Sequence, residues 1–344
     1  MNLRSLKTFY SAFHCARSKS VALGACFPLL LLACPAKQQS TVVNAPTPAP
    51  TVVAATTTAP PAIDGERAMN HVRAQVKIGP RPAGSPASNQ TREYIVKELN
   101  SYNLKITQDQ FEVKTPVGRK KMVNLTAELP GESGHVVLIG SHYDTKLFKE
   151  FRFVGANDGA SSTAVLLELA RVLAAAPQKP RLTYRFVFFD GEEAFCRDWD
   201  QCSADGGPDH TYGSRRYVAE LKERGELKTI HALILLDMVG ANPLRLGRDE
   251  LATTWLLDAI WQTARELGHG RHFLERTETV GDDDHKPFLE AGVEAVDLIQ
   301  LNEYPAWHTE EDSLDKISPQ SLQIVGDVVL ASLPRIEEKL LRGQ

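Results

Sequence analysis

The chain has 344 residues, of which 42% are hydrophobic and 24% are charged, as is ordinary for a globular protein with one large domain or two small ones. The formal net charge is −4 and the pI is near 6.2. Because the chain is slightly acidic and has no strongly basic run, the sequence argues against nucleic acid as a partner.

The first segment has the arrangement of charged and apolar residues that is typical of an export signal. Basic residues precede an apolar run at 21–32, which is too short for a comfortable membrane span. The run ends in Leu31-Leu32-Ala33-Cys34, which resembles a bacterial lipobox, where a signal peptidase cuts before the cysteine and the cysteine carries lipid. Residues 1–33 are therefore predicted to be a signal peptide, with Cys34 as the lipid attachment site.

The segment after the cysteine is predicted to be a tether. Residues 34–62 are mostly Pro, Ala, Thr, Val, Gln and Ser, which cannot bury a core. We expect a single catalytic domain at 63–344, monomeric and held at the cell envelope by the lipid anchor alone. Pro35 does not resemble an inner-membrane retention signal, so the periplasmic side of the outer membrane is the favoured location.

Hydrophobic periodicity predicts the elements of this domain. The first part has helices at 64–76 and 88–99, joined by the turn 79–84, and then strands at 105–113 and 121–128. Further strands are predicted at 136–139, 185–189, 232–236 and 295–301, with helices at 161–175, 212–221, 250–267, 287–290 and 319–341. This alternation predicts an α/β fold with a mixed, largely parallel central sheet and helices on both faces.

Two glutamates follow one of these predicted strands. The strand at 185–189 ends in Asp190-Gly191, and Glu192 and Glu193 come next. Open α/β sheets bind their ligands at the carboxyl ends of the strands. Adjacent side chains point to different sides, which suits a pair in which one carboxylate holds a cation and the other moves protons beside it.

Acids and histidines recur just after the other predicted strands and just before two helices. They are His142, Asp144, Asp158, Asp237, Asp283, Asp284, His285 and His308. Any one of the aspartates could simply cap a helix or end a strand. Carboxylates and imidazoles gathered at one edge of a sheet suit a borderline divalent ion, and zinc is the obvious candidate.

The order and spacing of these motifs resemble the clan of co-catalytic zinc aminopeptidases and their relatives, the animal-type glutaminyl cyclases. The shared motifs are 142–144, 157–159, 190–193, 236–238 and 307–309, and the likeness runs from about Gly79 to Asp315. Several motifs resemble the cyclase branch in particular: 142–146 with 153–156, 189–195, 212–215, 283–289, and Pro305 before Trp307. The chain is thus identified as a member of this clan, in a bacterial lipoprotein form.

The resemblance implies a zinc aminopeptidase-like fold and a glutaminyl-peptide cyclotransferase activity. Such an enzyme converts the amino-terminal glutamine of peptides or proteins to pyroglutamate and releases ammonia. One zinc ion would be held by Asp158, Glu193 and His308, which leaves a fourth position open, as in catalytic zinc sites. Glu192 would be the general acid and base.

The resemblance also assigns the surroundings of the reacting group. Asp237 and Asp283 would form a hydrogen-bond network with the general base. Trp199, Trp307 and Tyr304 would wall the substrate pocket, with Tyr304 at a position where relatives often carry Phe. The simpler interpretation of these aromatic residues is ordinary core packing.

The main alternative is an aminopeptidase of the same clan, which hydrolyses peptides with two metal ions. A second ion would be held by His142, Asp158 and Asp237, with Asp144 as a further ligand or a support, and Glu192 would activate a bridging water. Every ligand for either scheme is present, so residue identity leaves both open. A receptor module that has lost its site is disfavoured because no ligand is missing.

Two cysteines, Cys196 and Cys202, flank Trp199 in a loop. In an exported protein such a pair is expected to form a disulfide. The bond would stiffen the loop that presents Trp199.

Overall fold

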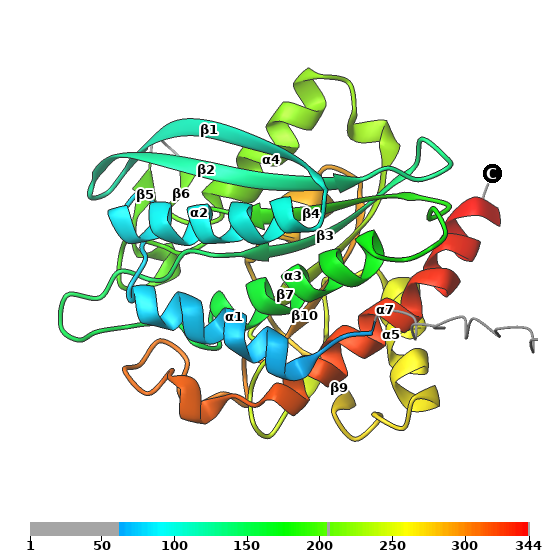
Figure 1. Ribbon diagram of the computed structural model, residues 1–344. Helices are drawn as coiled ribbons and strands as arrows, with labels where there is room; N and C mark the ends of the chain where they lie inside the picture. The colour runs from blue at the N-terminus through cyan, green and yellow to red at the C-terminus, as the bar shows by residue number, and fades with distance from the viewer. Residues whose placement is uncertain (1–61, 205–206, 343–344) are drawn as a thin grey trace, which may run out of the picture. The chain divides into compact units, whose positions relative to one another are not determined.

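The computed structural model describes residues 62–204 and 207–342 (Figure 1). The predicted signal peptide, the lipid site at Cys34 and nearly all of the predicted tether lie outside these residues. None of the described helices is both long and apolar enough to cross a membrane.

A six-stranded sheet organises the described chain, in the order β1-β2-β4-β3-β7-β10. Its strands are β1 Lys105–Thr115, β2 Gly118–Leu129, β3 Val136–His142, β4 Thr183–Phe189, β7 Ile230–Asp237 and β10 Glu294–Ile299. The hairpin β1-β2 is antiparallel and pairs antiparallel with β4, whereas β4, β3, β7 and β10 run parallel. The predicted mixed, largely parallel sheet is confirmed.

Helices cover both faces of this sheet. They are α1 Gly65–Ile78, α2 Pro86–Ser101, α3 Ala160–Ala174, α4 Tyr212–Glu223, α5 Thr254–Glu266, α6 Lys286–Glu290 and α7 Pro319–Arg342. The larger apolar core joins one face of the sheet to α1, α2, α3, α5 and α7, and a second core joins the other face to α4 and α6. Figure 1 shows α1, α3 and α7 crossing the same face.

The central strand β4 supplies both cores because successive side chains of a strand point to opposite faces. Phe186 and Phe188 lie in the larger core, and Val187 and Phe189 lie in the second one. All four are fully buried. The apolar run in the sequence is therefore continuous, since both of its faces are covered.

Hydrophobic periodicity did not predict some of the elements. Residues 246–249 form β8 Leu246–Asp249, which pairs parallel with β9 Phe273–Glu278, so the helix expected from 250 begins only at Thr254. Neither strand shows an alternating apolar pattern, and half of β9 is exposed. The remaining short elements are β5 Ser203–Ala204, β6 Gly207–Pro208, η1 Trp199–Gln201, η2 Leu227–Thr229 and η3 Leu314–Lys316.

Replacing Phe186 by Ala is expected to lower the free energy of unfolding by about 3–5 kcal/mol, because the change removes a fully buried ring and leaves a cavity. The control is Val117→Ala in the β1-β2 turn, where the side chain is 42% exposed and the change should stay within about 0.5 kcal/mol. Denaturant unfolding measures both. Similar losses in the two variants would contradict the assignment of β4 to the core.

Candidate active site

The parallel strands bring the predicted site residues to one edge of the sheet. His142 and Asp237 are the last residues of β3 and β7, and the two glutamates lie just beyond the end of β4. Asp158 stands two residues before α3, and His308 follows β10 in a loop. This edge is the carboxyl end of the parallel strands, where α/β sheets place their ligands.

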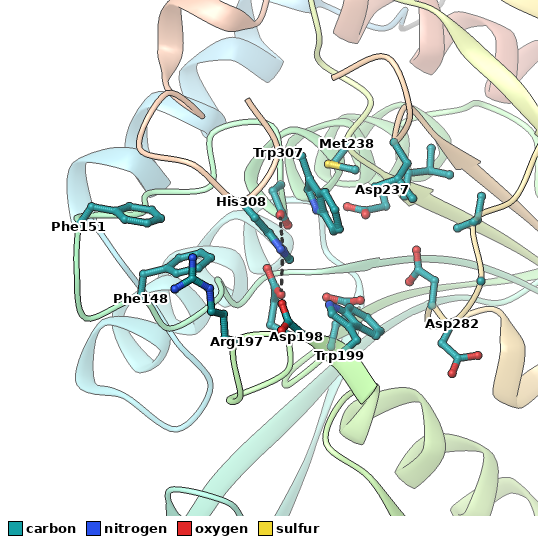
Figure 2. Close-up of a pocket in the computed structure, with 18 residues that line it drawn as sticks. Phe148, Phe151, Arg197, Asp198, Trp199, Asp237, Met238, Asp282, Trp307 and His308 are labelled. Carbon is teal, nitrogen blue, oxygen red and sulfur yellow. Dashed lines mark ion pairs between the residues drawn. The ribbon is translucent and has the colours of Figure 1, made fainter. Parts of the chain in front are cut away.

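All of these side chains except that of His142 line a cavity of about 580 Å³, drawn in Figure 2. The predicted residues that line it are Asp158, Glu192, Glu193, Trp199, Asp237, Asp283, Trp307 and His308. In the view of Figure 2, Phe148, Phe151 and Arg197 line the side away from Asp237. The volume is in the range of pockets that enclose small organic ligands.

Three potential metal ligands converge in this cavity. His308 Nε2 lies 3.3 Å from Glu193 Oε2 and 3.5 Å from Asp158 Oδ2 (Figure 2). Two ligand atoms bound tetrahedrally to one zinc ion at about 2.0–2.1 Å would be about 3.3 Å apart. Glu193 Oε2 is buried and accepts no hydrogen bond from the described residues. The donor set and its spacing therefore fit a divalent metal ion.

A second group of potential ligands shares Asp158 with the first. His142 Nε2 lies 3.1 Å from Asp237 Oδ1 and 3.3 Å from Asp158 Oδ1. All three residues are buried. The spacing alone therefore leaves room for either one metal ion or two.

Asp144 fixes the backbone of the paired glutamates. Its two carboxylate oxygens accept hydrogen bonds from Glu192 N at 3.2 Å and from Glu193 N at 3.4 Å. Lys146 N donates to Glu193 Oε1 at 3.1 Å. The side chain of Asp144 thus holds the turn after β4 in place.

Asp312 does the same for the segment before α3. Its carboxylate accepts hydrogen bonds from Asn157 N at 2.8 Å and Asp158 N at 3.1 Å. The hydroxyl of Tyr304 donates to Asp312 Oδ1 at 2.7 Å. Tyr304 is buried and is not among the residues that line the cavity, in contrast to the predicted wall.

Burial and charge shift the protonation of Glu192. Burial raises its pKa well above the ordinary value, the proximity of His142 opposes that rise, and the negative charges of Glu193, Asp283 and Asp284 add to it. A carboxyl group with a raised pKa can exchange protons near neutral pH. A raised pKa is one property that the predicted role of Glu192 as general acid and base requires.

A further acid, missed by motif reasoning, supports Asp283. Burial, and then the charge of Asp237, raises the pKa of Asp283 to about 6. Asp297 of β10 is fully buried, and its pKa is raised well above the ordinary value by burial and then by the charges of Asp283, Asp237 and Asp249. The sequence offered one sign of this residue, because Asp297 is an acid within a largely apolar predicted strand.

The loop with Trp199 is closed by a disulfide between Cys196 and Cys202, which confirms the predicted bond. The ring of Trp199 packs against His210, with the ring centroids 4.4 Å apart. On the other side of the loop, Lys146 Nζ donates to Cys196 O at 3.1 Å. Trp307 stacks on the ring of His308 at 4.1 Å, so aromatic rings border the ligand group.

Fold and site together define a protein of the zinc aminopeptidase-like fold with a candidate metal site, and comparison with known families agrees. The sequence matches peptidase family M28 over residues 124–333. The chain belongs to this family.

Within the family, the chain belongs with the glutaminyl-peptide cyclotransferases. It is 30% identical over 263 residues to the "Glutaminyl-peptide cyclotransferase" of Drosophila melanogaster, covering 69% of this chain and 72% of that protein. The crystal structure of an Acidobacteriales bacterium glutaminyl cyclase is 34% identical, with a TM-score of 0.75 over 82% of this chain and 98% of that one. The Porphyromonas gingivalis glutaminyl cyclase is 29% identical, with a TM-score of 0.71 over 79% and 98%.

The ligand geometry predicts that zinc stabilises the folded protein. Zinc added to chelator-treated protein is expected to raise the melting temperature, by an amount equivalent to about 2.7 kcal/mol at 100 times the dissociation constant. His308→Ala should remove most of this increase, because it deletes a ligand, whereas His269→Ala in the turn after α5 should keep it. Magnesium should act weakly, since it avoids imidazole. An unchanged zinc response in His308→Ala would contradict the site.

Proposed function

We infer that this protein is a glutaminyl-peptide cyclotransferase, which converts amino-terminal glutamine to pyroglutamate and releases ammonia. The observation that carries this inference is a buried carboxyl group of raised pKa, Glu192, beside a ligand group that fits one metal ion, in a chain whose relatives are glutaminyl cyclases. Peptides or proteins with amino-terminal glutamine are the substrates.

We propose that the metal is zinc, held by Asp158, Glu193 and His308. Two carboxylates and one imidazole form a donor set that zinc accepts, with one position left for substrate. When bound there, the ion would polarise the side-chain carbonyl of the glutamine as a Lewis acid.

Glu192 would carry the proton that the reaction moves. The α-amino nitrogen of the substrate forms a bond to the carbon of its own side-chain carbonyl, and the bond from that carbon to the amide nitrogen breaks. Glu192 would take a proton from the amine and deliver it to the departing nitrogen, so that ammonia leaves and a five-membered lactam remains. Its raised pKa supports both directions of transfer.

Asp237 and Asp283 would hold the amino group during this step. Both line the cavity, and their carboxylate oxygens would accept hydrogen bonds from the neutral amine that attacks. Asp297, protonated behind Asp283, would keep that carboxylate in place. Trp199 and Trp307 would pack against the aliphatic part of the glutamine, whereas Tyr304 would act through Asp312 on the metal ligand Asp158.

One observation favours a second candidate function, a two-metal aminopeptidase. The group of His142, Asp158 and Asp237 has spacing similar to that of the first ligand group. The relatives named as glutaminyl cyclases weigh against it. Two zinc equivalents per chain, with release of free amino acids, would identify the aminopeptidase.

We propose that the domain works in the cell envelope as a lipoprotein. The proposal rests on the charged and apolar order of residues 1–33, the lipobox ending at Cys34, and the tether-like composition of 34–62. A disulfide in the catalytic domain agrees with an oxidising compartment. The outer membrane is the preferred location and a monomer the expected state.

The activity is tested with a short peptide that begins with glutamine, incubated with the purified domain and analysed by mass spectrometry. The peptide is expected to lose ammonia and remain otherwise intact, and Glu192→Gln should slow the reaction by roughly 10²- to 10⁴-fold. A peptide that begins with asparagine, incubated under the same conditions, serves as the control. Release of free glutamine instead of ammonia would assign the enzyme to the aminopeptidases.

The raised pKa of Glu192 predicts the pH dependence. The ionised carboxylate is the base, so kcat/KM should fall as the pH drops through a pKa above the usual glutamate value. Asp283→Asn removes a negative charge that raises this pKa. The fall of kcat/KM at acid pH, the acid limb of the pH profile, should therefore move to lower pH. Asp315→Asn, at an exposed position in η3, is the control and should leave the limb in place. An acid limb that Asp283→Asn leaves unmoved would contradict the role of Glu192.

A further inference from the structure

The turn between α1 and α2 contains a buried arginine that the reaction does not use. Arg81 follows Gly79-Pro80, and its side chain is fully buried. Arginine is almost never fully buried without partners, since removing a guanidinium from water is costly. The groups that surround Arg81 therefore indicate its role.

The guanidinium of Arg81 holds two backbone segments that both lie more than 60 residues further along the chain. Its Nε donates to Tyr143 O at 2.9 Å. Its Nη1 donates to Val154 O at 2.6 Å, and its Nη2 donates to Gly155 O at 3.0 Å. The planar fork of an arginine can hold three carbonyl oxygens in fixed directions, which the single ammonium group of lysine cannot.

The backbone of Arg81 grips the first of these segments as well. Arg81 N donates to Thr145 Oγ1 at 2.9 Å, and Thr145 N donates to Arg81 O at 3.4 Å. Residues 143 and 145 are therefore both tied to Arg81. The residue between them is Asp144, whose carboxylate holds the backbone N–H groups of Glu192 and Glu193.

The second segment leads directly to the metal ligand Asp158. Gly155 O accepts a hydrogen bond from Arg81 and also one from Ala160 N, the first residue of α3. Gly155 has a φ of +51°, and a Cβ there would lie 2.3 Å from Asp158 O, so the two backbones are in close contact. The position of Gly155 thus limits the position of Asp158.

The charge of Arg81 also suits this location. Burial lowers its pKa to about 10, and the nearby acids Asp158, Asp144, Asp312 and Glu193 oppose that fall. The side chain is therefore a cation at neutral pH, placed behind a group of buried carboxylates. A buried charge of one sign needs the opposite sign nearby, and here each compensates the other.

We propose that Arg81 is a positioning residue of the metal site: it clamps residues 143–145 and 154–155 together, so that Glu193 and Asp158 are held at metal-binding spacing. The inference rests on the proposed function, since it assumes that these two residues bind zinc. Arg81 touches neither substrate nor metal in this scheme. It acts through Asp144 on one ligand and through Gly155 on the other.

The test is the zinc affinity of Arg81→Lys, which keeps the positive charge and loses the fork. Outer partners of metal ligands typically contribute about 10- to 100-fold to metal affinity, so the dissociation constant for zinc should rise by that factor. Competition with a chromophoric chelator measures it, and melting temperatures are recorded with and without zinc. The control is Arg185→Lys in β4, an arginine that pairs with Glu128 and Glu226. That variant should bind zinc like the wild type.

The outcomes separate the two proposals. Unchanged zinc affinity in Arg81→Lys, with equal losses of melting temperature with and without zinc, would make Arg81 a purely structural residue and overturn this inference. If Arg81→Lys does not fold, Thr145→Val removes only the acceptor of Arg81 N and should still weaken zinc binding several-fold. Unchanged zinc affinity in Thr145→Val would likewise overturn the positioning role of Arg81. A wild-type protein that binds no zinc would overturn the proposed metal site as well.

Discussion

The main physical constraint on this structure is the repulsion among the carboxylates that are buried together at the active site. Asp158, Glu192, Glu193, Asp237 and Asp283 all line one cavity, and each is at most 7% exposed. Like charges this close repel strongly where water is excluded. The arrangement is stable only if cations, protons or N–H donors offset the negative charge, and the surrounding chain supplies all three.

Each means of compensation has its own place in the site. The fixed cations are Arg81 behind Asp158 and Lys146 beside Glu193, both almost fully buried. Burial and then the charge of Asp283 raise the pKa of Asp297 well above its ordinary value, which favours the protonated form. The remaining negative charge faces the cavity, where a divalent ion and the ammonium group of a peptide can enter. The same negative charge would attract cationic groups into the cavity.

The sequence was sufficient for the features that depend on local pattern. The apolar run at 186–189 predicted a buried strand, and the acids after it predicted the site, because parallel strands end at one edge. The supporting residues were less accessible. Arg81 lies in a turn more than 60 residues from the backbone it holds, and the partners of a buried guanidinium follow from tertiary contacts alone. Tyr304 was assigned to the pocket wall by the family resemblance, whereas its hydroxyl is directed to Asp312.

The choice between one metal ion and two is a matter of charge at His142. Burial disfavours its protonation, but the acids around it, led by Glu192 and Asp237, outweigh burial and raise its pKa well above the ordinary value. Its Nε2 lies between Asp158 and Asp237, so that atom either carries a proton toward these carboxylates or offers a lone pair to an ion. The imidazolium and the second ion exclude each other, because both place positive charge in the same space. The same three ligands can therefore hold either a proton on His142 or a second metal ion.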